Sequence, residues 1–127
     1  AEIRLSSAQE MYLIKAESAL LSGSVADAVT NINAVRTLAG VDPITAADAT
    51  EGWTMLKRER GIELWLEARR LGDMRRWKAT SAPGAYHVYE TTNWEGTAYA
   101  PAYLSFPISQ GEMDTNPNIP LGDGRPF

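Results

Sequence analysis

Apolar residues recur at intervals of three and four over the first forty positions, with polar residues between them. This spacing places side chains on one side of a helix, so it predicts two helices in this part of the chain. The first runs from Ser7 to Leu21, with Glu10 at the capping-box distance from Ser7 and Gly23 as its end. Its apolar face is expected to consist of Ala8, Met11, Ile14 and Leu21.

The second predicted helix follows Ser24, which Asp27 supports as a cap, and ends at Gly40. Two helices joined by so short a turn form an antiparallel hairpin. The small residues Ala16 and Ala28 allow close approach of the two helices, and the length of the hairpin resembles a tetratricopeptide unit. The apolar face of the second helix is expected to consist of Val25, Ala28, Val29, Ile32 and Val35.

A third helix is predicted from about Gly52 to Trp77, after a cap formed by Thr45 with Asp48. Its apolar residues spread around most of the circumference, which is typical of a buried helix. Gly61 is costly inside a helix and therefore indicates close packing against a neighbour. The apolar residues concerned are Ile62, Leu64, Trp65, Leu66, Ala68 and Leu71.

The narrow remaining side of this predicted helix holds Glu59, Glu63, Glu67 and Arg70. Arg60, Arg69 and Asp73 are three or four positions from possible partners on the same helix. Carboxylates at four-residue spacing share a face and could serve as general acids or metal ligands. The neighbouring guanidinium groups fill the lone pairs that a metal would need, so we expect structural ion pairs and no catalytic or metal site. Arg69 is expected to reach inward to Asp73, Glu59 or Glu63.

Helical spacing is absent from Lys78 onward, where Gly, Pro, Thr and aromatic residues dominate. A long ordered loop is predicted, with a short hairpin around His87 to Thr91. One helical turn follows, capped by Ser109 with Glu112. The fold class is therefore mainly α.

We expect a single domain in two parts. The helical, tetratricopeptide-like part covers residues 1–77, and the loop-rich part of residues 78–127 packs on it. The aromatic residues of the second part are Tyr86, Tyr89, Trp94, Tyr99 and Tyr103. Flat rings match the apolar faces of sugars, so Trp94 and Tyr99 are candidates for a stacking platform. The alternative is that these rings pin the loop onto the helices.

Composition excludes several functions. The formal net charge of −4 argues against a nucleic-acid partner, which requires a basic patch. The chain has no cysteine and one histidine, His87, so a thiol nucleophile, a catalytic triad and a His-rich zinc site are not expected. No motif for phosphate or cofactor binding is present, and we expect neither an enzyme nor a cofactor.

Two groups of residues resemble the C-terminal signatures of the SusD/RagB family of outer-membrane nutrient-binding lipoproteins. The first group comprises Glu59-Arg60, Glu63-Leu64, Glu67-Ala68-Arg69 and Asp73-Met74-Arg75-Arg76-Trp77. The second comprises Phe106-Pro107-Ile108, Glu112 and Asn116-Pro117-Asn118. The departures are Ala68 where the family usually has Gly, Leu71-Gly72 where aromatics are common, and Ser109 where Pro is common.

The resemblance implies a partial SusD-like fold and a cell-surface protein that captures an oligosaccharide or peptide. It also implies delivery of that ligand to a TonB-dependent, SusC-like transporter. Members of this family run to several hundred residues, so these 127 residues are expected to be a mainly scaffolding fragment. Its lipid anchor to the outer membrane would lie in a segment outside this chain. The alternative is a helical protein-interaction module that self-associates through an uncovered apolar face.

Overall fold

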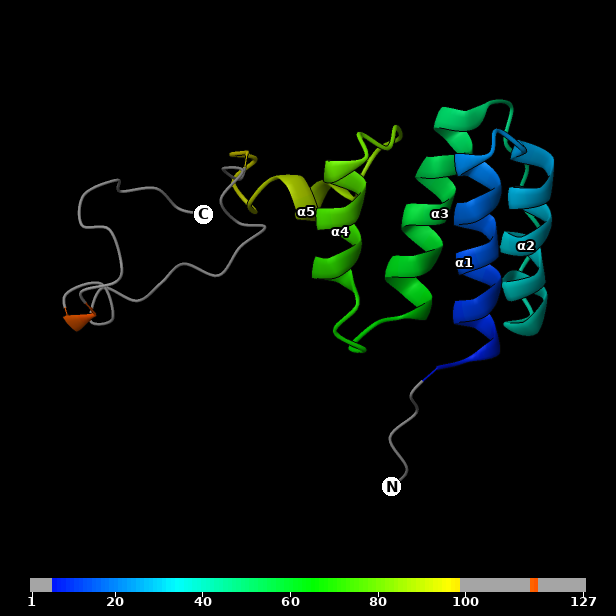
Figure 1. Cartoon of the computed structure of the whole chain (residues 1–127), viewed down its shortest axis with the longest axis horizontal. Helices are drawn as coiled ribbons and strands as arrows, with labels where there is room; N and C mark the ends of the chain where they lie inside the picture. The colour runs from blue at the N-terminus through cyan, green and yellow to red at the C-terminus, as the bar shows by residue number, and fades with distance from the viewer. Residues whose placement is uncertain (1–5, 99–114, 117–127) are drawn as a thin grey trace, which may run out of the picture. The chain divides into compact units, whose positions relative to one another are not determined.

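Four helices lie side by side in the first part of the chain: α1 (Ala8–Leu21), α2 (Val25–Leu38), α3 (Ala49–Glu63) and α4 (Arg70–Ala79) (Figure 1). The computed structural model describes residues 6–98 and 115–116. The chain consists of two compact units, Ala1–His87 and Val88–Phe127, and the four helices belong to the first. The described part is mainly helical, as the sequence predicts.

Local signals define the start of α1 and the turn between α1 and α2. Ser7 Oγ accepts a hydrogen bond of 3.0 Å from the Glu10 amide, which confirms the predicted start of α1. Gly23 ends α1 with φ +84°, a conformation that glycine adopts without steric cost. Ser24 begins α2, but its hydroxyl donates to Asp27 Oδ2 at 2.7 Å and does not cap the backbone as expected.

The core lies among α1, α2, α3 and the Trp77 side chain of α4. Its buried apolar residues are Leu13, Ala16, Leu20, Ala28, Ile32, Val35, Trp53, Leu56 and Trp77. The predicted face of α2 is confirmed at Ala28, Ile32 and Val35. Ala16 and Ala28, expected at the helix contact, are fully buried.

The predicted face of α1 is wrong, because Met11, Ile14 and Leu21 are exposed. This helix carries apolar residues on two sides, and periodicity alone does not choose between them. The side that is buried holds Leu13 and Leu20, and it also carries carboxylates that contact α4.

Helix α3 begins one turn later than Thr45 would have placed it. Asp48 is its N-cap and accepts a 2.8 Å hydrogen bond from the Glu51 amide. The Glu51 carboxylate in turn accepts from the Ala47 amide at 2.6 Å. The cap is therefore an Asp–Glu capping box, in which each side chain satisfies a backbone donor near the helix start.

The predicted continuous helix from Gly52 to Trp77 is wrong: α3 ends at Glu63 and α4 begins at Arg70. The connection contains two residues with left-handed backbone, Leu66 at φ 64° and Ala68 at φ 57°. Because the chain turns back here, α4 lies beside α3 and buries Trp77. The expected burial of Trp65 and Leu66 is also wrong, since they are 74% and 86% exposed at the corner.

A short segment after α4 returns across α3. Gly84 has φ +87°, and a Cβ atom there would lie 2.6 Å from Thr54 N and 2.8 Å from Thr50 O. The Ala85 amide donates to Thr54 Oγ1 at 2.9 Å. This contact places residues 78–87 in the first compact unit, so the boundary expected after Trp77 falls inside that unit.

The second unit is described over residues 88–98 and 115–116. It begins with the short helix α5 (Val88–Thr91), where a hairpin was expected. An isolated antiparallel bridge joins Thr92 to Ala98 after this helix. The predicted turn at Ser109 and Glu112 lies outside the described residues, as do Tyr99, Tyr103 and most of the second family signature. Among the described helices, none has the length and apolar character needed to cross a bilayer.

Candidate functional site

A chain of ion pairs across α1, α3 and α4 is the most developed polar feature of the first unit. At its centre, Arg60 of α3 donates from Nε and Nη2 to the two carboxylate oxygens of Asp73, at 2.7 Å and 2.8 Å. Both side chains are only 4% exposed. A buried bidentate pair of this geometry is strong but leaves a costly charge behind if either partner is removed.

Arg76 continues the network from α4 to α1. Its Nε and Nη2 donate to the two oxygens of Glu17 at 2.9 Å each, and Nη2 also lies 3.0 Å from Asp73 Oδ1. The hydrogen bonds to Glu17 are the main cause of a raised pKa for the Arg76 guanidinium, so this group stays charged. The Trp77 indole N–H donates to Glu17 Oε1 at 3.0 Å. Glu17 therefore fixes both α4 side chains.

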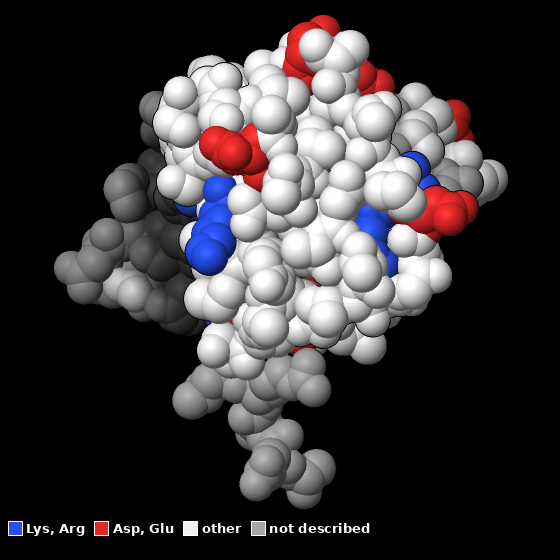
Figure 2. Space-filling model, turned by 90° about the vertical axis from the view of Figure 1, so that its right-hand side faces the viewer, with Lys and Arg blue, Asp and Glu red and all other residues white. Residues whose placement is uncertain are grey.

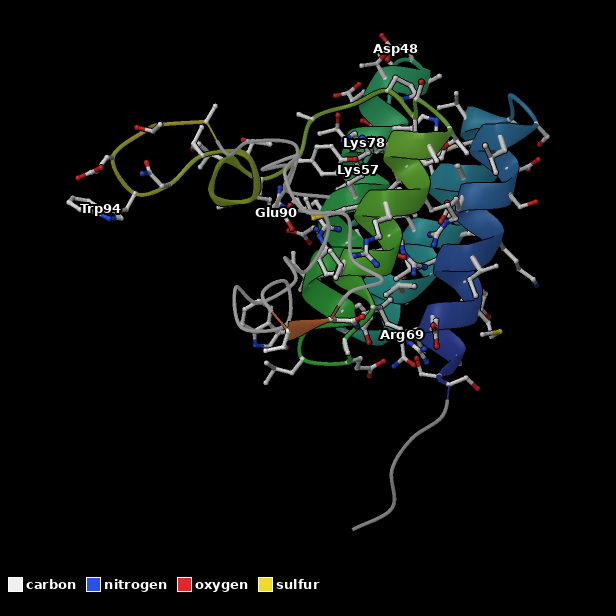
Figure 3. All side chains as sticks on the ribbon, turned by 60° about the vertical axis from the view of Figure 1, so that its left-hand side comes forward. Asp48, Lys57, Arg69, Lys78, Glu90 and Trp94 are labelled. Atoms are coloured by element: carbon white, nitrogen blue, oxygen red, sulfur yellow. The ribbon has the colours of Figure 1, made fainter. Side chains whose placement is uncertain are left out.

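Two further pairs extend the network. Arg69 lies beside Glu10 of α1 with an N–O distance of 3.3 Å, although Asp73, Glu59 or Glu63 was the expected partner. Glu59 instead pairs with Arg36 of α2. The expected partners all came from residues 59–73, whereas Glu10 belongs to α1. Figure 3 shows Arg69 near the start of α4.

The remaining charged residues of the predicted set lie at the α3–α4 corner. Arg70 donates from Nη1 to the Lys57 carbonyl at 2.9 Å, and a Cβ atom at Gly61 would lie 3.6 Å from the Arg70 guanidinium carbon. That guanidinium also lies 5.2 Å from the Trp77 ring centroid, within the range of a cation–π contact. Glu63 is half-buried and Glu67 is exposed.

Lys57 is a buried functional group that the sequence pattern did not reveal. Its ammonium donates to the carbonyls of Gly84 at 2.9 Å and Ala82 at 3.2 Å, and lies 4.1 Å from the Tyr86 ring centroid. Burial, and secondarily the Arg70 charge, lowers the pKa of Lys57. A lysine followed within thirty residues by a Pro-Gly turn gives too weak a signal to predict this contact. The lysine holds the segment after α4 against α3.

This arrangement does not resemble a catalytic or metal centre. Within residues 6–98 and 115–116, no three acidic, His or Cys side chains gather where a metal ion could bind. The carboxylates of Glu17 and Asp73 face guanidinium groups that occupy their oxygen atoms. Figure 2 shows isolated Lys and Arg side chains on the face it presents, without the continuous basic patch that nucleic acid requires.

A second feature lies in the second unit, where Trp94 occupies a tight turn (Figure 3). The Asn93 carbonyl accepts from Gly96 N at 3.0 Å, which closes the turn, and Gly96 has φ +81°. The Asn93 side chain accepts from the amides of Glu95 and Thr97 at 3.0 Å and 2.8 Å. Trp94 is 85% exposed. Its expected partner in a platform, Tyr99, lies outside the described residues.

The other aromatic side chains of this region differ in exposure. Tyr86 packs against the Trp77 ring, with 6.1 Å between centroids, and so pins the segment after α4 to the helices. Tyr86 therefore packs as the alternative predicts, whereas the indole of Trp94 is exposed.

Three exposed apolar side chains lie at the α3–α4 corner. They are Ile62, Trp65 and Leu66.

Comparison with known proteins connects these observations. The model of the SusD family matches residues 2–120, which includes the whole ion-pair network and the Trp94 turn. Searches among curated proteins and among solved structures gave no match. Proteins of this family bind nutrients at the cell surface, and the two signatures noted in the sequence lie within the matched range. The chain therefore belongs to the SusD family.

Proposed function

We propose that this chain is the scaffold portion of a cell-surface protein that captures a glycan or peptide for a TonB-dependent outer-membrane transporter. Family membership supports nutrient binding. The ion pairs of Asp73 and Glu17 support the scaffold role, because carboxylates that are bound to guanidinium groups are not available for acid–base chemistry. In this proposal the charged residues of the first family signature stabilise the fold, and the protein binds its ligand without enzymatic activity.

The exposure of Trp94 is the main support for ligand contact by this part of the protein. Burying an indole is strongly favourable, so a tryptophan that remains 85% exposed on a hydrogen-bonded turn is typical of a binding residue. An indole face stacks on the apolar face of a sugar ring and leaves the sugar hydroxyls in water. Trp94 is the ligand contact in this proposal, and Tyr99 is its candidate partner.

Partner and location follow from the family. The ligand passes to a SusC-like transporter, and a lipid anchor outside these residues holds the protein at the outer membrane. No nucleic acid takes part.

A glycan and peptide array probed with this chain tests the proposal. The expected result is binding to a subset of oligosaccharides or peptides that the Trp94→Ala variant loses. Trp65→Ala is the matched control, because Trp65 is also exposed but lies on the other unit. Binding that survives Trp94→Ala would remove this turn from the site. Co-purification of a SusC-like transporter with the parent protein tests the partner.

The second candidate function is a protein-interaction or self-assembly module. It is favoured by the apolar corner of Ile62, Trp65 and Leu66, since contiguous exposed apolar side chains mark interaction surfaces. Light scattering during size exclusion distinguishes the candidates. A monomer at micromolar concentration argues against self-assembly, whereas a dimer that Trp65→Ala dissociates supports it.

A further inference from the structure

The turn that carries Trp94 is built around one side chain, Asn93. Its backbone amide donates to the Thr97 carbonyl at 2.8 Å, in addition to the turn-closing bond from Gly96. Its side-chain oxygen accepts from the amides of Glu95 and Thr97. These four hydrogen bonds fix the backbone of residues 93–97. They therefore also fix the directions in which the side chains of residues 94 and 95 leave the backbone.

Those two side chains are Trp94 and Glu95, at the central positions of the turn, and both are exposed. An indole face and a carboxylate are thus displayed on consecutive residues of a hydrogen-bonded turn. The face of an indole attracts cations and the C–H groups of sugars. The carboxylate accepts hydrogen bonds from hydroxyl or ammonium groups but repels other anions.

The charge of the surrounding segment has one sign. Residues 88–98 contain Glu90 and Glu95 and no Lys, Arg or His. Within this described segment there is therefore no cationic side chain to receive a carboxylate or sulfate of a ligand.

We propose that the Trp94–Glu95 turn selects saccharides by charge, taking amino sugars and neutral sugars in preference to uronic acids and sulfated sugars. This inference rests on the proposed function and narrows the class of its ligand. An amino sugar gains twice, because its ammonium is attracted both by the indole face and by the Glu95 carboxylate. A neutral sugar gains only stacking and hydrogen bonds. An acidic sugar must place its charge beside Glu95 without a compensating cation.

Three tetrasaccharides of one linkage provide the test, built respectively from glucosamine, glucose and glucuronic acid. Titration of the full chain with each should give the affinity order glucosamine, glucose, glucuronic acid. The glucosamine oligomer should bind about fivefold to twentyfold more tightly than the glucose oligomer at low salt. Raising the salt concentration from about 0.05 M to about 0.5 M should shrink that advantage.

Glu95→Gln is the decisive variant, since it keeps the shape and removes the charge. It should abolish most of the glucosamine advantage and leave glucose-oligomer binding unchanged. Glu67→Gln, at an exposed glutamate of the first unit, is the control and should alter none of the affinities. A glucosamine advantage in Glu95→Gln as large as in the wild type overturns the inference.

Trp94→Ala separates this inference from the proposed function. If it leaves every affinity unchanged, the turn is not a ligand site and both fail. If it abolishes binding while the three oligomers bind the wild type equally, the site stands and charge selection fails. If tetralysine binds through Trp94 and Glu95 while the glucosamine oligomer does not, the ligand class is wrong.

Discussion

Arg60 of α3 holds Asp73 of α4 through two parallel hydrogen bonds of 2.7 Å and 2.8 Å, in a position that solvent hardly reaches. Removing one partner of such a pair leaves a buried charge without compensation. Arg60→Ala should therefore lower the free energy of unfolding by about 3 to 5 kcal/mol. Arg60→Lys should recover little of it, because an ammonium cannot make the planar two-point contact. Urea unfolding followed by circular dichroism measures both.

Arg69 is the control for that measurement. Its side chain is 42% exposed, although its partner Glu10 is only 10% exposed, so solvent screens this pair more than the buried Arg60–Asp73 pair. Arg69→Ala should therefore cost less than Arg60→Ala. Equal losses of unfolding free energy from the two substitutions would contradict the view that burial decides how much each arginine of the first family signature stabilises the fold.

Gly84 and Gly23 have nearly the same backbone conformation, with φ of +87° and +84°, but different surroundings. A Cβ at Gly84 would meet the α3 backbone, whereas nothing lies within 4 Å of one at Gly23. Gly84→Ala should cost about 2 to 5 kcal/mol from strain and overpacking together, and Gly23→Ala about 1 to 2 from strain alone. Thermal unfolding compares them. A smaller loss at Gly84 would show that the segment after α4 does not rest on α3.

Ala68 has φ 57° at a position where the family usually has glycine. Ala68→Gly should raise the free energy of unfolding by about 0.5 to 1 kcal/mol, because relief of left-handed strain exceeds the added freedom of the unfolded chain. Ala26→Gly, at an exposed position of α2, should have the opposite sign, with a loss of about 1 kcal/mol. Losses from both would contradict the backbone geometry assigned to the α3–α4 corner.

Lys57 gives the protein a predictable dependence on pH. Because the pKa of Lys57 is lowered in the folded protein, the unfolded chain binds more protons between that value and the ordinary 10.5. Wild-type stability should therefore rise relative to Lys57→Met as the pH increases through this window, and the difference should be constant below it. Urea unfolding of both proteins from neutral pH upward measures the difference. A difference that falls with pH would mean that the folded protein favours the ammonium.

Sequence periodicity predicted the bounds of α1 and α2, because Ser7 and Glu10 cap one helix and Gly23 and Gly40 end both, but it favoured the wrong face of α1. It failed at the α3–α4 corner because Leu66 and Ala68 adopt a left-handed backbone that their residue types disfavour. The turn allows α4 to bury Trp77 and to pair Asp73 with Arg60 of α3. These contacts join separate helices, so local sequence patterns do not reveal them.

The candidate sites were likewise predictable only where local sequence signals define them. Charge spacing indicated ion pairs over residues 59–73, and Arg60 pairs with Asp73 inside that range. Glu10, which pairs with Arg69, is on α1, more than fifty residues earlier. Lys57 was missed because its partners are backbone carbonyls, which every residue has. Trp94 could be named as a candidate from composition, while its exposure required the turn around Asn93.

The affinity of the Trp94→Ala variant for an oligosaccharide that the wild type binds tests the central claim, that the turn contacts ligand while the ion-pair network supports the fold. Isothermal titration should show a loss of about 1 to 3 kcal/mol, the typical value of one stacked ring, with the melting temperature nearly unchanged. Trp65→Ala should bind like the wild type. A Trp94→Ala protein that melts much earlier yet binds with unchanged affinity would contradict the account, since Trp94 would then be a packing residue.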